Sequence, residues 1–458
     1  MKYISTRDNS KEYSFEQVFI KGLADDGGLF IPKEVKKYNA EQIKALSNLS
    51  YQNLAKEIIY PFIGDFMTIN ELSDIVDRSY SVFRKDNVVD LIKLGDATIL
   101  ELFHGPTLAF KDIAMQLLGN FYEHYLKKNN KNINVIVATS GDTGAAAIDA
   151  IKGKKNMNIF VLHPHNKVSL VQRKLMSTVK EKNVFNIAIE GNFDDCQNLV
   201  KSMFADKEFS KSINMSGVNS INWARIIAQS VYYFYTYFQI KDDRPINFSV
   251  PTGNFGDVYA GYLSKKMGLP INKLIVATNQ NDILHRAISR GKYEAETVLE
   301  TNSPSMDIQI ASNFERLIYD LNDFDDRETQ KVMSGIKEEG KYIIPENKMK
   351  KIDRDFLSAS INENEVLDII KEVHTMYIIL LDPHSAIGFG ALKKVNIEGN
   401  NIVLATAHPC KFPEAIDRSI GIKPDLPDDL KYVMDEKENY DIISNNLSKT
   451  QQYIKEKI

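Results

Sequence analysis

Cysteine, net charge and long apolar runs are all scarce in this sequence. The 458 residues include two cysteines, Cys196 and Cys410, which are too few for a disulfide framework and favour a reducing compartment. The stretch MKYISTRDNSKEYSF at 1–15 lacks the apolar core of a signal peptide, and no apolar run approaches the roughly 20 residues that span a bilayer. The net charge of −4 gives no electrostatic reason to expect nucleic acid or an anionic membrane as a partner. We therefore expect a cytoplasmic protein that binds neither nucleic acid nor a membrane.

Nucleotide and metal signatures are missing as well. No G-x-G-x-x-G follows a predicted strand, which argues against a dinucleotide-dependent enzyme, and no glycine loop ends in the Gly-Lys-Ser/Thr of a Walker loop. Among the histidines, only His163 and His165 are close in sequence, and two ligands without a third make a poor metal site. We expect no metal.

The remaining composition is that of an ordinary globular protein, with 43% hydrophobic and 26% charged residues. A chain of this length is expected to form two or three domains. Apolar spacing predicts helices over residues 1–92, with N-caps at Ser14, Asn39 and Thr68.

Short strand-like runs alternate with helical stretches in the rest of the chain. They fall into an earlier and a later group: INVIVATS, NIFVLHP and VFNIAIEG, then INFSVPT, KLIVATN and NIVLATAH. Near-continuous apolar strands followed by helices are typical of parallel sheets with both faces covered. We predict an α/β fold with two parallel-sheet domains, a smaller one over 93–215 and a larger one over 216–458, behind a helical N-terminal region.

In parallel sheets, ligands bind where strands lead into helices. Three predicted strand ends carry groups that could hold a ligand there. The turn at 140–143 offers free N–H groups and two hydroxyls at a helix start, a suitable receptor for a carboxylate or phosphate. The turn at 253–256 is bracketed by glycines and suits a phosphate. Each turn taken alone is explained equally well by helix capping or turn chemistry. The last strand ends in Thr406, a hydroxyl donor, followed by the cation Lys411.

Lys111 is the residue that links these features. It follows an apolar run, Leu108 to Phe110, at the start of a predicted helix. An ordinary first-turn lysine with a solvated head group is the usual explanation of such a residue. An apolar setting and a helix N-terminus would, however, favour the neutral, nucleophilic amine. A lysine, an anion-receiving turn and a hydroxyl match the aldehyde, phosphate and ring nitrogen of pyridoxal phosphate.

The sequence resembles the threonine synthases, which are fold type II pyridoxal-phosphate enzymes related to tryptophan synthase β. The resemblance extends over almost the whole chain and is carried by several motifs: FHGPTLAFKD, VATSGDTGAAAI, EGNFDDCQNLVK, NSINWARIIAQSVYYF, PTGNFGDVYAGY, SNFERLIYDL and ATAHPCKFPEA. It is nearest to the longer members, which carry an extra helical N-terminal region. Asp8 departs from the glycine expected after STR.

The resemblance implies a role for each strand-end residue. Lys111 would bond covalently to the cofactor, and Thr406 would face its pyridine nitrogen. The cofactor phosphate would be held by the glycine turn: Gly253, Asn254, Phe255, Gly256 and Asp257. The substrate α-carboxylate would be received by the other turn: Ser140, Gly141, Asp142 and Thr143. Asp142 stands where an asparagine often contacts the cofactor's ring hydroxyl in the wider fold type, so the partner of that hydroxyl stays open.

The implied reaction converts O-phospho-L-homoserine and water to L-threonine and phosphate, by γ-elimination and β-addition of water, as the last step of threonine biosynthesis. An O-phosphohomoserine phospho-lyase giving 2-oxobutyrate, ammonia and phosphate is the alternative. Arg225 and Lys411 are candidates for the substrate phosphate, with Asn222 and Ser220 as further donors, although a helix-surface ion pair explains Arg225 equally well. A non-catalytic relative would be expected to have lost Lys111. We expect a monomer or homodimer.

Overall fold

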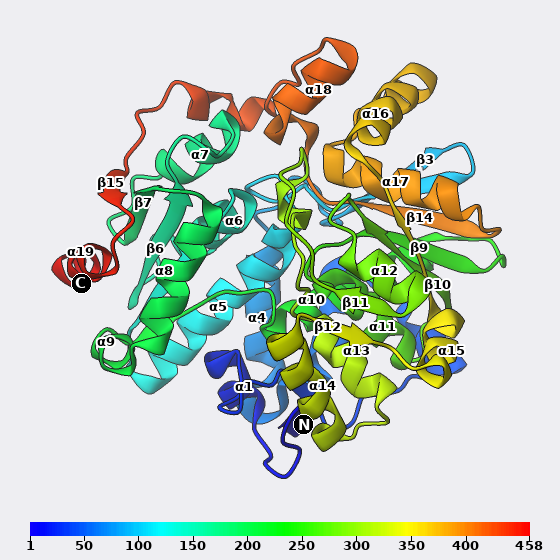
Figure 1. Ribbon diagram of the computed structural model, residues 1–458, viewed down its shortest axis with the longest axis horizontal. Helices are drawn as coiled ribbons and strands as arrows, with labels where there is room; N and C mark the ends of the chain where they lie inside the picture. Colours follow the sequence, from blue (N-terminus) through cyan, green and yellow to red (C-terminus); the bar gives the residue numbers. More distant parts are fainter.

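The computed structural model describes residues 1–458 and contains two parallel sheets of unequal size (Figure 1). The larger sheet has six strands, in spatial order β13 (Phe356–Ser360), β10 (Ile271–Thr278), β9 (Ile246–Pro251), β14 (Asn400–Ala405), β4 (Ala97–Glu101) and β3 (Asp90–Leu94). The smaller sheet has five, in the order β15 (Asp441–Ser444), β7 (Val184–Glu190), β6 (Met157–Pro164), β5 (Ile133–Ala138) and β8 (Met215–Ser216). All neighbours are parallel except β3 and β4. The predicted α/β class is confirmed, and the two groups of predicted strands fall into different sheets.

At two places, the strands of the observed sheets come from segments that were expected to belong to the other domain. β4 lies within the segment expected to form the smaller domain, yet its hydrogen bonds join it to β14 of the larger sheet. β15 lies near the C-terminus and pairs with β7, so it completes the smaller sheet. Both corrections come from pairings between segments that are distant in sequence, which local apolar patterns do not encode.

The N-terminal region is helical, as predicted, with one small addition. Its helices are α1 (Phe15–Lys21), α2 (Ala40–Leu46), α3 (Tyr51–Ile63) and α4 (Ile69–Tyr80). Ser14, Asn39 and Thr68 each form a reciprocal capping box, which confirms the predicted N-caps. The region also contains an antiparallel pair, β1 (Tyr3–Ser5) with β2 (Phe30–Pro32), whose three-residue strands are too short to show a period in the sequence.

The remaining helices connect and cover the sheets. They are α5 (Lys111–Asn129), α6 (Asp142–Ile151), α7 (Leu170–Ser177), α8 (Phe193–Ala205), α9 (Lys207–Ser212), α10 (Trp223–Gln239), α11 (Gly256–Lys266), α12 (Ile283–Arg290), α13 (Phe314–Leu321), α14 (Asp326–Glu339), α15 (Glu346–Asp355), α16 (Glu363–Tyr377), α17 (Pro383–Val395), α18 (Pro413–Ile420) and α19 (Leu447–Lys457). A last antiparallel pair joins β11 (Lys292–Glu294) and β12 (Lys341–Ile343). None of the helices is both long and apolar enough to cross a bilayer.

One large core unites the two sheets. It contains 100 buried residues, and α5 and α10 pack against each other within it, between the sheets (Figure 1). The outer face of the larger sheet is covered by α16 and α17 over a separate cluster, and the outer face of the smaller sheet by α8, α9 and α19. Because most of the apolar burial is shared, both sheets hold their strand ends in fixed relation to α5 and α10.

Candidate active site

Lys111 is the first residue of α5 and lies where two neighbouring strands of the larger sheet end. The loop 102–110 leads to it from β4. In this loop, the Phe110 N–H donates to the Thr406 carbonyl at 2.9 Å, and the Leu108 carbonyl accepts from the His408 N–H at 3.1 Å. These bonds hold Lys111 beside the segment that follows β14, so the predicted lysine and the predicted hydroxyl are brought together.

The Lys111 amine is buried, with its residue 7% exposed. Its Nζ lies 3.2 Å from Asp142 Oδ2 and 3.2 Å from Ser305 Oγ. Burial lowers the pKa of Lys111, Asp142 acts against this shift, and the positive charges of Lys411 and Arg225 reinforce it. The structure thus places Lys111 out of bulk solvent with a depressed pKa, unlike an ordinary surface lysine.

Asp112, the neighbour whose direction the sequence left open, turns away from the amine. Its carboxylate accepts hydrogen bonds from the Thr107 N–H at 2.8 Å and the Thr107 hydroxyl at 2.6 Å. Burial raises the pKa of Asp112 to about 6. Asp112 therefore fixes the loop before Lys111 and gives the amine no direct ion pair.

Asp142 lies between two lysines. Lys411 Nζ is 2.7 Å from Asp142 Oδ1 and also donates to the Thr107 carbonyl at 2.7 Å, and its side chain is 0% exposed. Gln172 donates to the same Asp142 oxygen at 2.8 Å. Burial would raise the pKa of Asp142, but Lys411 and Lys111 outweigh it and hold that pKa well below its usual range. Lys411, expected at the substrate phosphate, is instead engaged as the counter-ion of Asp142.

The turn before α6 is shaped by Gly141, whose φ of +134° lies in the region that favours glycine. A Cβ at Gly141 would come within 2.6 Å of the Gln172 side chain, so a larger residue would require Gln172 to shift. The N–H groups of Gly141 and Gly144 both donate to Thr139 Oγ1, each at 2.9 Å. The Thr139 hydroxyl oxygen therefore accepts both of these hydrogen bonds, and the hydroxyls of Ser140 and Thr143 take no part in them.

The glycine turn at 253–256 lies close to Lys111. It connects β9 to α11, with Phe255 in the left-handed conformation at φ +63°. A Cβ at Gly253 would lie 2.7 Å from the carbonyl oxygen of Ser305, the residue whose hydroxyl contacts Lys111 Nζ. Asn254 accepts a backbone hydrogen bond from Asn313 at 3.1 Å. The anion-receiving turn and the lysine are therefore joined through a single residue.

Asp257, grouped with that turn, points its side chain elsewhere. Its Oδ1 accepts hydrogen bonds from the hydroxyls of Tyr232 and Tyr233 on α10, the latter at 2.9 Å. Burial raises the pKa of Asp257 to about 6, and its Oδ2 is buried without a partner. The carboxylate thus anchors the start of α11 to α10.

Thr406 is held by residues that the sequence did not single out. Its N–H donates to Ser385 Oγ at 3.1 Å, and Ser385 in turn donates to Asp382 at the start of α17. The sequence DPHS carries an N-cap signal, Asp followed by Pro, that could have identified the helix start. No local pattern relates this start to Thr406, because the pairing joins different segments of the chain.

Arg225 is buried, at 4% exposure, near the beginning of α10. Its Nη1 donates to the Val218 carbonyl at 3.2 Å, whereas its Nε is buried without a partner. Burial lowers the pKa of Arg225 to about 10. A helix-surface ion pair is therefore the wrong explanation of Arg225, and a buried guanidinium with a free donor suits an anion.

The Asn222 side chain and the Ser220 backbone carbonyl are both engaged by the protein itself. Asn222 Oδ1 accepts from the Ala224 N–H at 3.0 Å as the cap of α10, and its Nδ2 donates to the Phe19 carbonyl at 2.9 Å. The Ser220 carbonyl accepts from Asn313 at 3.3 Å. Asn222 therefore ties α1 to α10, a structural task that the sequence did not indicate.

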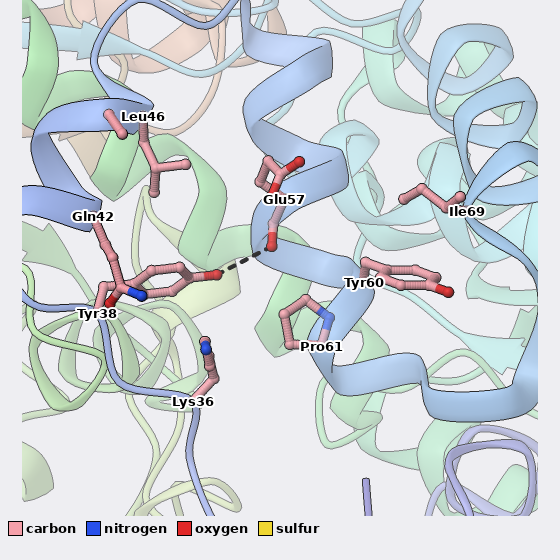
Figure 2. A pocket seen from close by; sticks show the side chains of 9 residues that line it. Lys36, Tyr38, Gln42, Leu46, Glu57, Tyr60, Pro61 and Ile69 are labelled. Carbon is pink, nitrogen blue, oxygen red and sulfur yellow. Dashed lines mark hydrogen bonds between the residues drawn. The ribbon is translucent and has the colours of Figure 1, made fainter.

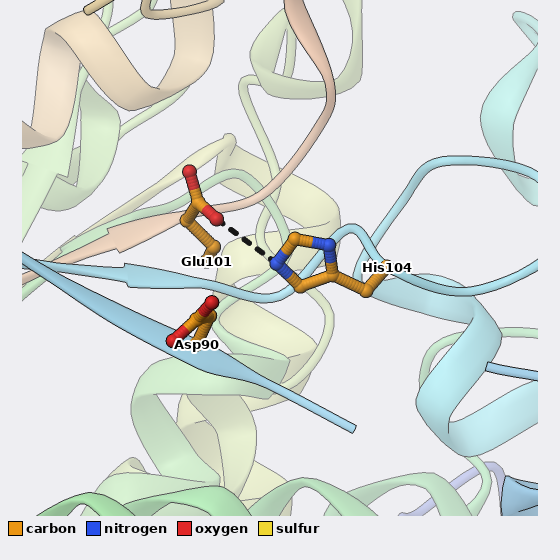
Figure 3. Close-up of side chains that lie close together, drawn as sticks. All are labelled: Asp90, Glu101 and His104. Atoms are coloured by element: carbon orange, nitrogen blue, oxygen red, sulfur yellow. Dashed lines mark hydrogen bonds and ion pairs between the residues drawn. The ribbon is translucent and has the colours of Figure 1, made fainter. Parts of the chain in front are cut away.

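Two further features take no part in the contacts around Lys111. Asp90, Glu101 and His104 cluster on β3, β4 and the following loop (Figure 3), but His104 is paired with Glu101 at 2.9 Å and Asp90 with Lys85 at 2.8 Å. A pocket of about 420 Å³ opens between α2 and α3, where the Tyr38 hydroxyl donates to the Glu57 carbonyl (Figure 2). Neither feature contains a residue of the site.

Comparison with known proteins agrees with this geometry. A family model described as pyridoxal-phosphate dependent enzyme matches residues 98–406, and models of the threonine synthase N terminus and C-terminal region match residues 2–80 and 385–454. A threonine synthase of Pseudomonas aeruginosa is 44% identical, with 99% of this chain and 98% of the relative covered. The chain belongs to the threonine synthase family. A threonine synthase of Saccharomyces cerevisiae is 42% identical, with 94% of this chain and 92% of the relative covered.

The family's solved structures have the same fold. A pyridoxal-phosphate-bound threonine synthase from Brucella melitensis has a TM-score of 0.97 at 44% identity, with 100% of this chain and 99% of that chain covered. The predicted family, fold type II class and cofactor are thereby confirmed.

The residues present fit that cofactor. Lys111 would supply a buried amine for the aldehyde, and the glycine turn beside Ser305 would supply a close-approach cradle for the phosphate. Thr406, which follows β14 and is buried, would supply a hydroxyl for the ring nitrogen. The unpartnered Nε of Arg225 leaves a further cationic donor for an anionic substrate.

Proposed function

We propose that the chain converts O-phospho-L-homoserine and water to L-threonine and phosphate. The observation that carries this proposal is the buried Lys111 amine, 3.2 Å from Asp142 and from Ser305, between two anion-receiving turns. The family to which the chain belongs supports the same reaction. By the same reasoning the enzyme takes a small-molecule substrate and supplies the last step of threonine biosynthesis.

The proton transfers depend on Lys111. Pyridoxal phosphate, when bound, supplies a conjugated ring that stabilises negative charge on the substrate carbons next to the amino group. The lowered pKa of Lys111 favours the neutral amine, which can accept a proton from the substrate α-carbon. Asp142 Oδ2, at 3.2 Å, then stabilises the ammonium that forms. Lys411 keeps Asp142 ionised for this purpose.

Three anions have to be held in this site, and the chain offers three separate receptors. The 253–256 turn and the N-terminus of α11 would hold the cofactor phosphate. Ser140 and Thr143, with the N-terminus of α6, would receive the substrate α-carboxylate. Arg225 would hold the substrate phosphate, because its buried Nε has no partner within the protein. Asn222 and Lys411 are left out of this assignment, since both are committed to contacts inside the protein.

All of these residues come from one chain, so a monomer or a homodimer would serve. Both cysteines are free and buried, which suits a cytoplasmic location.

Product analysis tests the proposal. Purified enzyme given O-phospho-L-homoserine should release phosphate and threonine in equal amounts, and Lys111→Ala should release neither. If 2-oxobutyrate and ammonia accompany phosphate as the main products, the chain is instead the phospho-lyase. This alternative shares every binding residue, because the two reactions diverge only in whether water adds before product release.

The assignment of Arg225 has its own test. Arg225→Gln should raise the Michaelis constant for phosphohomoserine at least 10-fold, while Arg244→Gln, at an exposed arginine paired with Asp242, should leave it unchanged. An unchanged Michaelis constant in Arg225→Gln would remove Arg225 from the substrate site.

A further inference from the structure

An aspartate–histidine pair stands at the N-terminus of α17. His384 Nδ1 lies 2.7 Å from Asp382 Oδ2, and the His384 N–H donates to the same oxygen at 3.0 Å. Both side chains are buried, at 5% and 0% exposure. A carboxylate on Nδ1 fixes the tautomer with hydrogen on Nδ1, which leaves Nε2 with a free lone pair.

The His384 ring belongs to the same strand-end region as Lys111. Its neighbour Ser385 holds Thr406, and its ring centroid is 4.9 Å from that of Phe412, which follows Lys411. Lys411 is paired with Asp142 at 2.7 Å, and Asp142 is paired with Lys111 at 3.2 Å. The ring therefore lies beside the segment whose Lys411 is joined to Lys111 through Asp142.

The Nε2 atom of His384 has no hydrogen-bond partner although it is buried. A histidine that served only to cap α17 would need its Nδ1 alone, and a purely structural ring would usually satisfy both nitrogens. A buried acceptor with its tautomer fixed by a carboxylate, in the strand-end region that also holds a reactive lysine, is the arrangement of a general base.

The proposed reaction needs such a base in addition to Lys111. When water adds to the substrate β-carbon, the α-carbon has to take up a proton, and the Lys111 ammonium is the group that delivers it. Lys111 cannot accept the proton of water in the same step. A second group with a free lone pair is required.

We propose that His384 Nε2 is the general base for water addition, an inference that rests on the proposed function. One O–H bond of water breaks, its proton goes to Nε2, and the oxygen forms the new bond to the β-carbon. The π electron pair of the double bond between the α- and β-carbons moves to the α-carbon, which takes its proton from Lys111, and the single bond between the two carbons remains. The proton on His384 then returns through solvent to the Lys111 amine, so that protons and charge balance. His384 thereby decides whether threonine or 2-oxobutyrate is released.

The test uses the holoenzyme with His384→Asn, whose side-chain amide can still donate to Asp382 but has no atom at the Nε2 position. His124→Asn is the matched control, because His124 Nε2 is also buried without a partner but lies on α5 beside Phe66. Phosphate, threonine and 2-oxobutyrate are measured together. We expect His384→Asn to release phosphate at a rate within a few fold of the parent, with at least a 10-fold lower ratio of threonine to 2-oxobutyrate. His124→Asn should keep the parental ratio.

An unchanged ratio in His384→Asn, or an equal loss of both products, would overturn the role of His384. A parent enzyme that makes only 2-oxobutyrate would overturn the proposed function instead, so the two failures are distinguishable. A second readout does not depend on turnover. ¹⁵N NMR of histidine-labelled protein, assigned by comparison with His384→Asn, should show hydrogen on Nδ1 and none on Nε2, and Asp382→Asn should reverse this. Hydrogen on Nε2 in the parent would refute the inference.

Discussion

The ion pair between Lys411 and Asp142 should be strongly coupled energetically. Its atoms are 2.7 Å apart, and the two side chains are 0% and 4% exposed. Removing one partner of a buried pair leaves a buried charge and costs about 3–5 kcal/mol. After Lys411→Met, Asp142 still has its contacts with Lys111 and Gln172. We therefore expect this substitution to lower the free energy of unfolding by about 3 kcal/mol, the lower end of that range. Asp142→Asn should cost a similar amount, because Lys411 would keep only the Thr107 carbonyl.

A double-mutant cycle measures the coupling. The double variant Lys411→Met/Asp142→Asn contains no unpaired charge from this pair, so its cost should be smaller than the sum of the single costs by about 2 kcal/mol. Urea unfolding of the cofactor-free protein at neutral pH gives the four free energies of unfolding. The exposed pair Lys393 and Glu372 is the control, with an expected coupling of at most ~0.5 kcal/mol. Additive costs at Lys411 and Asp142, within ~0.5 kcal/mol, would refute the reasoning.

Three other substitutions test separate parts of the structure. Gly253→Ala should weaken cofactor binding at least 10-fold in equilibrium dialysis, because the new Cβ would lie 2.7 Å from the Ser305 carbonyl oxygen. An unchanged affinity would show that the turn does not hold the phosphate. Asn222→Ala should lower the free energy of unfolding by about 1 kcal/mol, because α10 loses its cap, and should leave the Michaelis constant for phosphohomoserine unchanged. A raised Michaelis constant would return Asn222 to the substrate site. Burial raises the pKa of Asp257 to about 6, so the folded protein holds this proton more tightly than the unfolded chain, and the resulting stability is lost as pH rises through that value. Relative to Asp257→Asn, the parent should lose about 1 kcal/mol between pH 5 and pH 8 in urea titrations, and a constant difference would contradict the shift.

Much of the site could be predicted because it follows a local rule. The 140–143 turn, the 253–256 turn and Thr406 each follow an apolar strand that the sequence marks clearly, and parallel strands bring their carboxyl ends to one edge of a sheet. Lys111 is marked instead by the apolar run before it at the start of a predicted helix. The helical N-caps were equally visible, because a capping box is contained within four residues.

The parts that could not be predicted depend on contacts between distant segments. Ser305 lies in a three-residue 3-10 helix, Pro304–Met306, which is too short to show a period in the sequence, yet its hydroxyl reaches Lys111 across 194 positions of the chain. The engagement of Lys411 with Asp142, rather than with a substrate anion, depends on how the loop after β14 meets α6. The sheet positions of β4 and β15 are long-range in the same sense.

Chemical trapping of the cofactor on one lysine tests the central claim most directly. Borohydride reduction of the yellow holoenzyme, followed by proteolysis and mass spectrometry, should place the reduced cofactor on the peptide that contains Lys111. Lys111→Ala should lack both the absorption band and the labelled peptide. Label on a different lysine, or a band that persists in Lys111→Ala, would contradict the account.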